Sequence, residues 1–400
     1  MKELAKLSGD AAADTTALLA EKTSLTEQRT KLDAEIPATM VMAEPAEPRP
    51  IFVLKRGQYD QPGEQVTAAF PNALVSHESA VVATVPEIPD RLQLARWLTD
   101  PAHPLTARVA VNRLWEMLFG TGIVETAEDF GIQGALPSHP ELLDWLSTEL
   151  LKQGWDQRAI LKQILMSATY RQSSHVTRRH PRSPRFVARS RAALSIASKT
   201  VRDNALFVSS LLKEKIGGPS VKPYQPDGLW EDVSVERRDK YVADTDDGLY
   251  RRSMYTFWKR TCPPPGMATF DAPDRETCVV RRARTNTPLQ ALVLLNDPTY
   301  VESARKLAER VMLASDNDDA RIVLAFRIVL ARLPGNSEQA TLQKILAEAR
   351  AHFTTTPTGA AEFLSIGNSP RDTSLNPVDL AAWSAVMSVI MNLDESISKQ

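Results

Sequence analysis

Apolar residues recur three and four positions apart over most of the chain after residue 90, which is the spacing of one helix face. The clearest cases are 105–119, 142–150, 160–168 and 319–332. We therefore expect a mainly α fold, with about nine helices arranged as an orthogonal bundle between residues 90 and 400.

Residues 1–36 carry a different apolar pattern. Leu18, Leu25 and Leu32 continue a seven-residue repeat that begins at Leu4, but the second stripe that a coiled coil needs is mostly polar. This pattern predicts an amphipathic helix that packs against another part of a protein.

Short apolar runs replace the helical spacing between residues 37 and 89. The run at 51–54 is bounded by Pro-rich and Gly-rich segments, which is typical of a strand, and we expect an extended, partly β connector here. A small β-hairpin is also predicted at about residues 240–260, because the side chains of 250–259 alternate in character around a polar loop. We therefore expect the chain to have three parts: a helix at 1–36, a connector at 37–89 and a helical domain at 90–400.

Capping sequences predict where several helices begin. The run T-P-L-Q at 287–290 has a capping residue, a proline at the first helical position and a glutamine at the third. Ser138 and Glu141 have the spacing of a capping box, and Asp156 is a candidate cap for the helix that follows it.

Charge and composition narrow the classes of function. The net charge of −1 gives no case for nucleic acid or an anionic membrane as a partner. Residues 1–10 have no apolar leader, and no run approaches the roughly 18 apolar residues of a membrane span. Taken literally, these features predict a soluble chain that starts in the cytoplasm; the alternative is that Met1 is an internal residue of a longer exported protein.

The sequence lacks the common catalytic and metal-binding motifs. Zinc-helix, nucleophile-elbow, phosphate-loop and dinucleotide-binding patterns are all absent. Cys262 and Cys278 lie outside any C-x-x-C motif, and could either pair in an oxidising compartment or remain free thiols.

Candidate chemistry is concentrated between residues 249 and 298. The residues that could form a ligand site are Arg252, Trp258, Asp271, Arg275, Glu276, Arg281 and Arg282. Arginine side chains could clamp a carboxylate or sulfate, a tryptophan could stack on a sugar ring, and Asp271 or Glu276 could act as an acid or base. A network of ion pairs that fixes an irregular loop to the helices is the favoured alternative.

A second basic stretch spans residues 171–191, with seven arginines, two histidines and no acid. It could bind phosphate or sulfate groups. Because it contains several prolines and lacks interleaved aromatic residues, a polar connection between helices is the favoured interpretation.

Several long motifs resemble one known family. They include R-G-Q-Y-D-Q-P-G-E, N-R-L-W-E-M-L-F-G-T-G, G-G-P-S-V-K-P-Y-Q-P-D-G-L-W and F-D-A-P-D-R-E-T-C-V-V-R-R-A-R-T-N-T-P-L-Q-A-L. From about residue 40 to the C-terminus the chain resembles the planctomycete-type domain of unknown function that follows cytochrome-c-like modules. Lys199 departs from the resemblance, which leads us to expect an acid there.

The resemblance implies a setting rather than a reaction. Relatives of this type are large exported proteins with an N-terminal cytochrome-c-like module, so we expect an extracytoplasmic, N-terminally truncated product whose residues 1–36 are the tail of a missing domain. Haem c would belong to the missing module, with no cofactor in this chain. Expected partners are that module and, by the same resemblance, sulfatase-like proteins or polysaccharide, with no nucleic acid and no membrane span.

These expectations lead to one preferred function and two alternatives. The preferred function is a binding or scaffold module of a larger exported cytochrome-c-associated protein, linked to the use of complex sulfated polysaccharide. The alternatives are a polysaccharide hydrolase or lyase that uses Asp271 or Glu276, and a docking domain for a haem module in electron transfer. Whether the chain is an enzyme is left open at this point.

Overall fold

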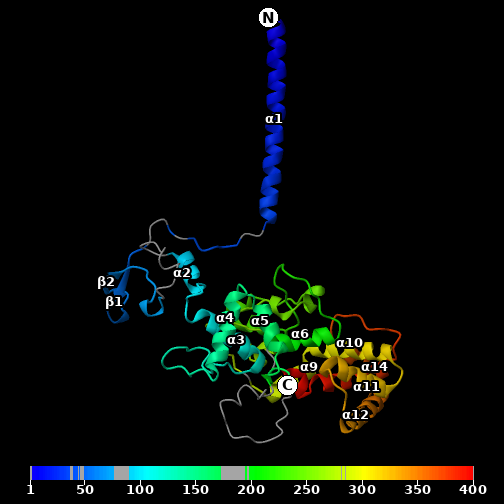
Figure 1. Cartoon of the computed structure of the whole chain (residues 1–400). Helices are drawn as coiled ribbons and strands as arrows, with labels where there is room; N and C mark the ends of the chain where they lie inside the picture. The colour runs from blue at the N-terminus through cyan, green and yellow to red at the C-terminus, as the bar shows by residue number, and fades with distance from the viewer. Residues whose placement is uncertain are drawn as a thin grey trace. The chain divides into compact units, whose positions relative to one another are not determined.

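The computed structural model describes residues 2–36, 39–43, 45, 49–75, 90–172, 194–195, 198–280, 282–283 and 285–399 (Figure 1). The chain divides into two compact units, residues 1–103 and 104–400. Each unit is described by itself. Arg281 and nearly all of the basic stretch at 171–191 lie outside the described residues, so the predictions made for them stay predictions.

The first unit contains a long helix, a hairpin and a short helix. Helix α1 spans Lys2–Glu35, where the sequence predicts a helix, and its leucines at 18, 25 and 32 are each more than half exposed. Strands β1 (Ile51–Leu54) and β2 (Pro62–Val66) pair antiparallel, with Ile51 opposite Val66. The extended, partly β region therefore contains the small two-stranded sheet.

Helix α2 (Arg91–Leu98) completes the first unit. The Asp90 side chain accepts a hydrogen bond from the N–H of Gln93, and the Gln93 side chain accepts one from the N–H of Asp90. Phe70 stacks on the buried Trp97 ring at 4.8 Å between ring centroids. Short 3₁₀ turns at Lys55–Gly57 and Asn72–Leu74 connect these elements.

Three helices form one core of the second unit. They are α3 (Thr106–Phe119), α4 (Pro140–Lys152) and α5 (Gln157–Met166), and Val111, Leu150 and Ile160 are fully buried between them. The Asp156 side chain caps α5, as predicted. The Ser138 cap prediction was wrong: α4 begins after His139, and the Ser138 hydroxyl instead donates to the carbonyl of Ile123.

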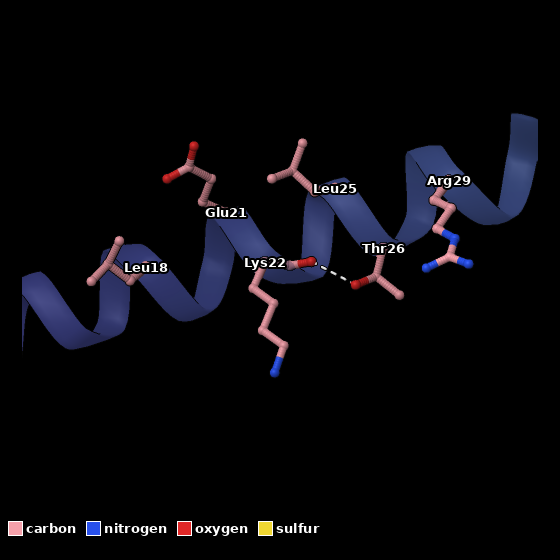
Figure 2. A pocket seen from close by; sticks show the side chains of 6 residues that line it. All are labelled: Leu18, Glu21, Lys22, Leu25, Thr26 and Arg29. Atoms are coloured by element: carbon pink, nitrogen blue, oxygen red, sulfur yellow. Dashed lines mark hydrogen bonds between the residues drawn. The ribbon is translucent and has the colours of Figure 1, made fainter.

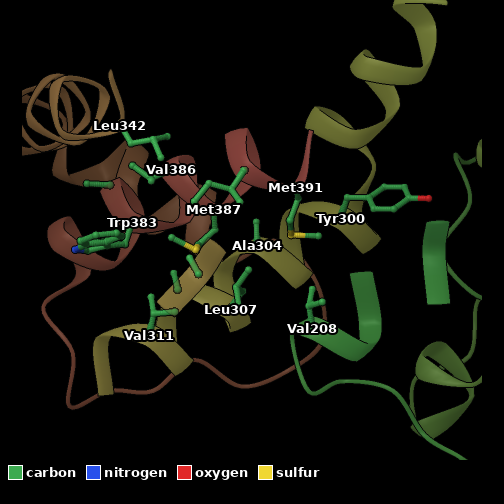
Figure 3. Packing of buried hydrophobic residues seen from close by; sticks show 14 of the residues in the cluster. Val208, Tyr300, Ala304, Leu307, Val311, Leu342, Trp383, Val386, Met387 and Met391 are labelled. Carbon is green, nitrogen blue, oxygen red and sulfur yellow. The ribbon is translucent and has the colours of Figure 1, made fainter. Parts of the chain in front are cut away.

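The larger core is built around α14 (Pro377–Met391), which is apolar on nearly all sides and therefore lies inside. Trp383, Met387 and Ile390 are fully buried, and Figure 3 shows the first two facing α10 residues such as Leu307. The helices around α14 are α6 (Ser198–Val208), α9 (Pro288–Asn296), α10 (Pro298–Ala314), α11 (Asp318–Leu330), α12 (Asn336–Thr355), α13 (Pro357–Leu364) and α15 (Asp394–Ile397).

Short elements fill the chain between α6 and α9. They are α7 (Leu229–Val233), α8 (Pro265–Thr269) and 3₁₀ turns at Val235–Arg237, Asp247–Tyr250 and Ser253–Tyr255. Strands β3 (Leu194–Ser195) and β4 (Ser398–Lys399) form a second, very short antiparallel pair. The fold is thus mainly α, and the described residues after 90 contain fourteen helices, α2 to α15, rather than about nine.

The hairpin predicted at about residues 240–260 was wrong. This region forms 3₁₀ turns and single bridges, in which Arg251 pairs parallel with Lys213 and Thr256 pairs parallel with Val221. The reason is that its backbone carbonyl groups find other donors: a buried arginine side chain, Arg202, binds the carbonyls of Leu249 and Arg251. The alternating side-chain pattern therefore belongs to a run of 3₁₀ turns and single bridges and not to an arm of a hairpin.

Candidate functional site

A hollow of about 510 Å³ lies against one face of α6. The α6 side chains that line it are Thr200, Asp203, Asn204 and Phe207. The opposite wall comes from the segment 212–216, together with Arg252 and Tyr255. Three stretches that are distant in sequence therefore meet here, and two of the wall residues lie in the stretch that the sequence singles out.

Arg202 fixes the 249–253 segment beside this hollow. Its side chain is 5% exposed, and it donates to the carbonyl oxygens of Leu249 at 2.5 Å and Arg251 at 2.9 Å, and to the Ser253 hydroxyl at 3.1 Å. Burial lowers the pKa of Arg202, while Tyr300 and the acids nearby oppose that shift. The planar guanidinium thus satisfies backbone carbonyl groups that a neighbouring strand would otherwise bind.

Asp203, the next residue of α6, faces the hollow itself. It accepts a hydrogen bond from the N–H of Ser253 at 2.7 Å and pairs with Arg252 at 3.6 Å. Because one carboxylate serves both the backbone and the Arg252 guanidinium, Asp203 sets where the predicted ligand residue Arg252 lies.

Arg251 and Tyr255 hold the far wall. The buried Arg251 guanidinium donates to the carbonyls of Lys215, Gly217 and Pro219, and it lies 4.0 Å from the centre of the Tyr255 ring. The Tyr255 hydroxyl accepts from the N–H of Gly217 at 3.0 Å. One face of this aromatic ring is therefore covered by the protein itself.

Asp271 closes the loop that the sequence singles out. Its carboxylate accepts the backbone N–H of Thr285 at 2.7 Å and the Thr285 hydroxyl at 2.9 and 3.0 Å. The buried Gln290 amide donates to the carbonyls of Thr269 and Thr285, which ties both ends of the loop to α9. Asp271 and Arg275 both have positive φ, and these bonds offset the cost of that backbone.

Trp258 and Arg275 lie against one another. The Arg275 guanidinium is 4.4 Å from the centre of the Trp258 ring, and the indole N–H donates to the carbonyl of Asp274 at 3.0 Å. Arg275 therefore covers one face of the ring that could stack on a sugar. The exposed Glu276 is placed by its own N–H, which donates to the Asp274 carboxylate.

Three cations gather beside the first turn of α6: Lys199, Arg275 and Arg282. Partial burial lowers the pKa of Lys199, and the positive charges of Arg275 and Arg282 lower it further, while Asp203 opposes them. Within the described part of the chain, no carboxylate lies at ion-pair distance from any of these three side chains. The arrangement leaves cationic charge that an anion could neutralise.

A family model for a protein of unknown function, PSD1 (DUF1553), matches residues 90–346. The chain belongs to the DUF1553 family. No curated protein and no solved structure matches it. The residues of the candidate site, from Lys199 to Arg282, all lie within the part that matches the DUF1553 model.

Sequence reasoning missed two residues of this DUF1553 site, Asp203 and Lys199. A signal for the first was present: Arg202 and Asp203 stand among the apolar positions Val201, Ala205 and Leu206 of α6. Charged residues on an apolar face need buried partners. What the sequence does not contain is the identity of those partners, which lie 47 to 51 residues away.

A shallow space along α1 of this DUF1553 protein does not form a ligand site. Figure 2 shows six side chains of α1 around a shallow space of about 340 Å³, all from a single helix. The Thr26 hydroxyl there donates to the carbonyl of Lys22, within the helix. Since the space has only one wall, it cannot enclose a ligand.

The described side chains and helices of this DUF1553 protein bear on two other possibilities, a metal site and a membrane span. Among the residues described, no three His, Cys, Asp or Glu side chains come together as a metal site requires. Across the described helices, none combines the length and apolar character of a membrane span. Cys262 and Cys278 are free thiols.

Proposed function

We propose that this domain is a non-catalytic binding module for sulfated polysaccharide within a larger exported, cytochrome-c-associated protein. One observation carries the proposal: Lys199, Arg275 and Arg282 lie near one another, and among the described residues no carboxylate is at ion-pair distance from them. Arginine forks and ammonium groups are the side chains that bind sulfate oxygens best. The exported setting and the cytochrome-c-like partner follow from the family resemblance.

The hollow along α6, which begins at Thr200 next to Lys199 in the sequence, supports a saccharide ligand. The hollow along α6 has the volume of a small-molecule site, and its lining combines Asp203, Asn204 and Glu214 with Phe207 and other apolar groups. Polar groups of this kind can bind sugar hydroxyls while the cations bind the sulfate esters.

The engaged acids favour binding over hydrolysis. Both Asp271 oxygens accept hydrogen bonds from Thr285, and Asp203 is shared between Ser253 and Arg252. A glycosidase needs two carboxyl groups that are free to exchange protons or attack the sugar. These contacts therefore give less support to the hydrolase or lyase alternative in which Asp271 is the acid or base.

The test compares dextran sulfate with unsulfated dextran by isothermal titration calorimetry. In the variant K199M/R275Q/R282Q we expect the affinity for dextran sulfate to fall at least about tenfold, because each lost charge-assisted hydrogen bond is worth roughly 1.5–3 kcal/mol. The slope of log affinity against log salt concentration should also become shallower.

A matched control removes the same net charge elsewhere. The variant R113Q/R158Q/K162M changes three exposed cations on α3 and α5. It should alter dextran sulfate binding by less than about twofold. Equal losses in both variants would mean that only bulk charge matters, and the proposal would fail.

A further inference from the structure

A second hollow, of about 530 Å³, shares a wall with the first. The segment 210–216 contributes to both: Leu212 and Ile216 line the hollow along α6, whereas Leu211 and Lys213 line the second. Alternate side chains of an extended segment point to opposite sides, and Lys213 is held in a single parallel bridge to Arg251.

The base of the second hollow is a buried polar cluster on α10. Glu302 is 1% exposed and accepts hydrogen bonds from the hydroxyls of Tyr250 at 3.0 Å and Tyr224 at 3.1 Å. It also accepts the backbone N–H of Ser369 at 2.5 Å. Burial raises the pKa of Tyr250, so its hydroxyl stays protonated and continues to donate. Tyr250 in turn lines the hollow.

The remaining wall, residues 368–370, is fixed to the same cluster. Arg305 donates to both the carbonyl and the hydroxyl of Ser369 at 2.8 Å, and the N–H of Asn368 donates to the Tyr224 hydroxyl at 2.7 Å. A side chain at Gly367 would meet Glu302, since an added Cβ would lie 2.3 Å from its Cδ. The wall is therefore preorganised rather than free to collapse into the space.

The charges around this hollow are balanced, unlike those of the group formed by Lys199, Arg275 and Arg282. Two carboxylates, Asp246 and Asp247, and two ammonium groups, Lys213 and Lys306, line it together with Asn368. Lys213 pairs with Asp247 at 3.1 Å, and Lys306 pairs with Glu309. Alternating donors and acceptors without excess charge suit hydroxyl groups better than an ionic ligand.

We propose that this second hollow is a subsite for an uncharged sugar ring, whose hydroxyls are bound by Asp247, Asn368 and the adjacent ammonium groups. The volume is that of a small-ligand site. The inference takes the saccharide class of the ligand from the proposed function and rests on it to that extent. One polysaccharide would then place sulfate esters at the cations and an unsulfated ring in the second hollow.

The test measures binding of neutral hexasaccharides prepared from agarose, xylan and dextran to the full chain, with dextran sulfate in parallel. The variant D247A/N368A removes two side chains at the rim and leaves the backbone bond from Asn368 to Tyr224 in place. We expect at least about a tenfold loss of affinity for the neutral hexasaccharide that binds best. In contrast, K199M/R275Q/R282Q should leave neutral binding within about twofold.

The outcomes separate the two proposals. If no neutral hexasaccharide binds at millimolar concentration, or if D247A/N368A binds it unchanged, the second subsite is overturned while the cationic site stands. If K199M/R275Q/R282Q keeps full affinity for dextran sulfate, the proposed function fails first. The single variant N368A, whose side chain is exposed, repeats the measurement should D247A/N368A melt at a lower temperature than the wild type.

Discussion

Replacing Gly367 with alanine tests whether the Glu302 cluster holds the C-terminal loop as described. Gly367 has φ of 89°, a backbone conformation that alanine adopts only at a cost of roughly 1–2 kcal/mol. The added Cβ would also lie 2.3 Å from Cδ and 2.6 Å from Oε1 of Glu302. Either the loop or the buried carboxylate must move.

The magnitude follows from the bonds that such a shift breaks. Glu302 accepts three hydrogen bonds, from Tyr224, Tyr250 and Ser369. A hydrogen bond to a charged group contributes roughly 1.5–3 kcal/mol. Losing one or two of them and adding the backbone cost gives a loss of about 2.5–8 kcal/mol, compared with the roughly 5–15 kcal/mol by which domains are usually stable.

Urea unfolding followed by tryptophan fluorescence measures this loss, and Gly228 supplies the control. Gly228 has φ of 83°, but an alanine Cβ there would meet no atom within 4 Å. G228A should therefore cost only the backbone part, about 1–2 kcal/mol. If G367A and G228A destabilise the chain equally, the Glu302 contact contributes nothing and the reasoning is wrong.

Three other predictions concern single side chains. The Glu338 carboxylate accepts from Arg332 and from the N–H of Gly335, and these bonds lower its pKa to about 2. Its contribution to stability is therefore complete above pH about 4.3 and is lost as the pH falls through 2. Because the pair is about one-third exposed, E338Q should cost about 1 kcal/mol at neutral pH in urea titrations. The cost should shrink to a small fraction of this at pH 2, where the folded-state carboxylate is half protonated. Asn112 is fully buried and binds both the N–H and the carbonyl of Val124, so N112L should lower the free energy of unfolding by about 2–4 kcal/mol; a loss below about 1 kcal/mol would contradict this. R202M should speed hydrogen exchange of the amides at 249–255, and unchanged exchange there would show that the guanidinium does not hold the segment.

The parts of the fold that follow from neighbouring residues were predictable. The run at 287–290 marks a helix that does begin at Pro288, with the Thr287 N–H donating to the Gln290 side chain. The Asp156 side chain caps α5 by accepting hydrogen bonds from the backbone N–H groups of Arg158 and Ala159. These elements depend on contacts within one helical turn, so the sequence contains all of the necessary information.

The parts of the fold that depend on partners distant in the sequence were not predictable. The alternation around Tyr255 predicts a hairpin, yet the hydrogen bonds of this segment go to Arg202 and to residues 213 and 221. At the candidate site, the charged residues of the 252–282 stretch were recognised, but the role of Lys199 beside Arg275 and Arg282 needs the fold that brings α6 to the loop. A single sequence shows which residues could bind an anion and not which of them lack a carboxylate partner.

Gln290 makes the loop before α9 tolerant of changes within it. One buried amide binds the carbonyls of Thr269 and Thr285, so the two ends of the intervening loop stay together whatever lies between them. Lengthening a loop whose ends are already held costs little, roughly 0.6 kcal/mol for each doubling. Changes of side chain between Ala272 and Arg282 should therefore leave the two ends of the loop, and the start of α9, in place.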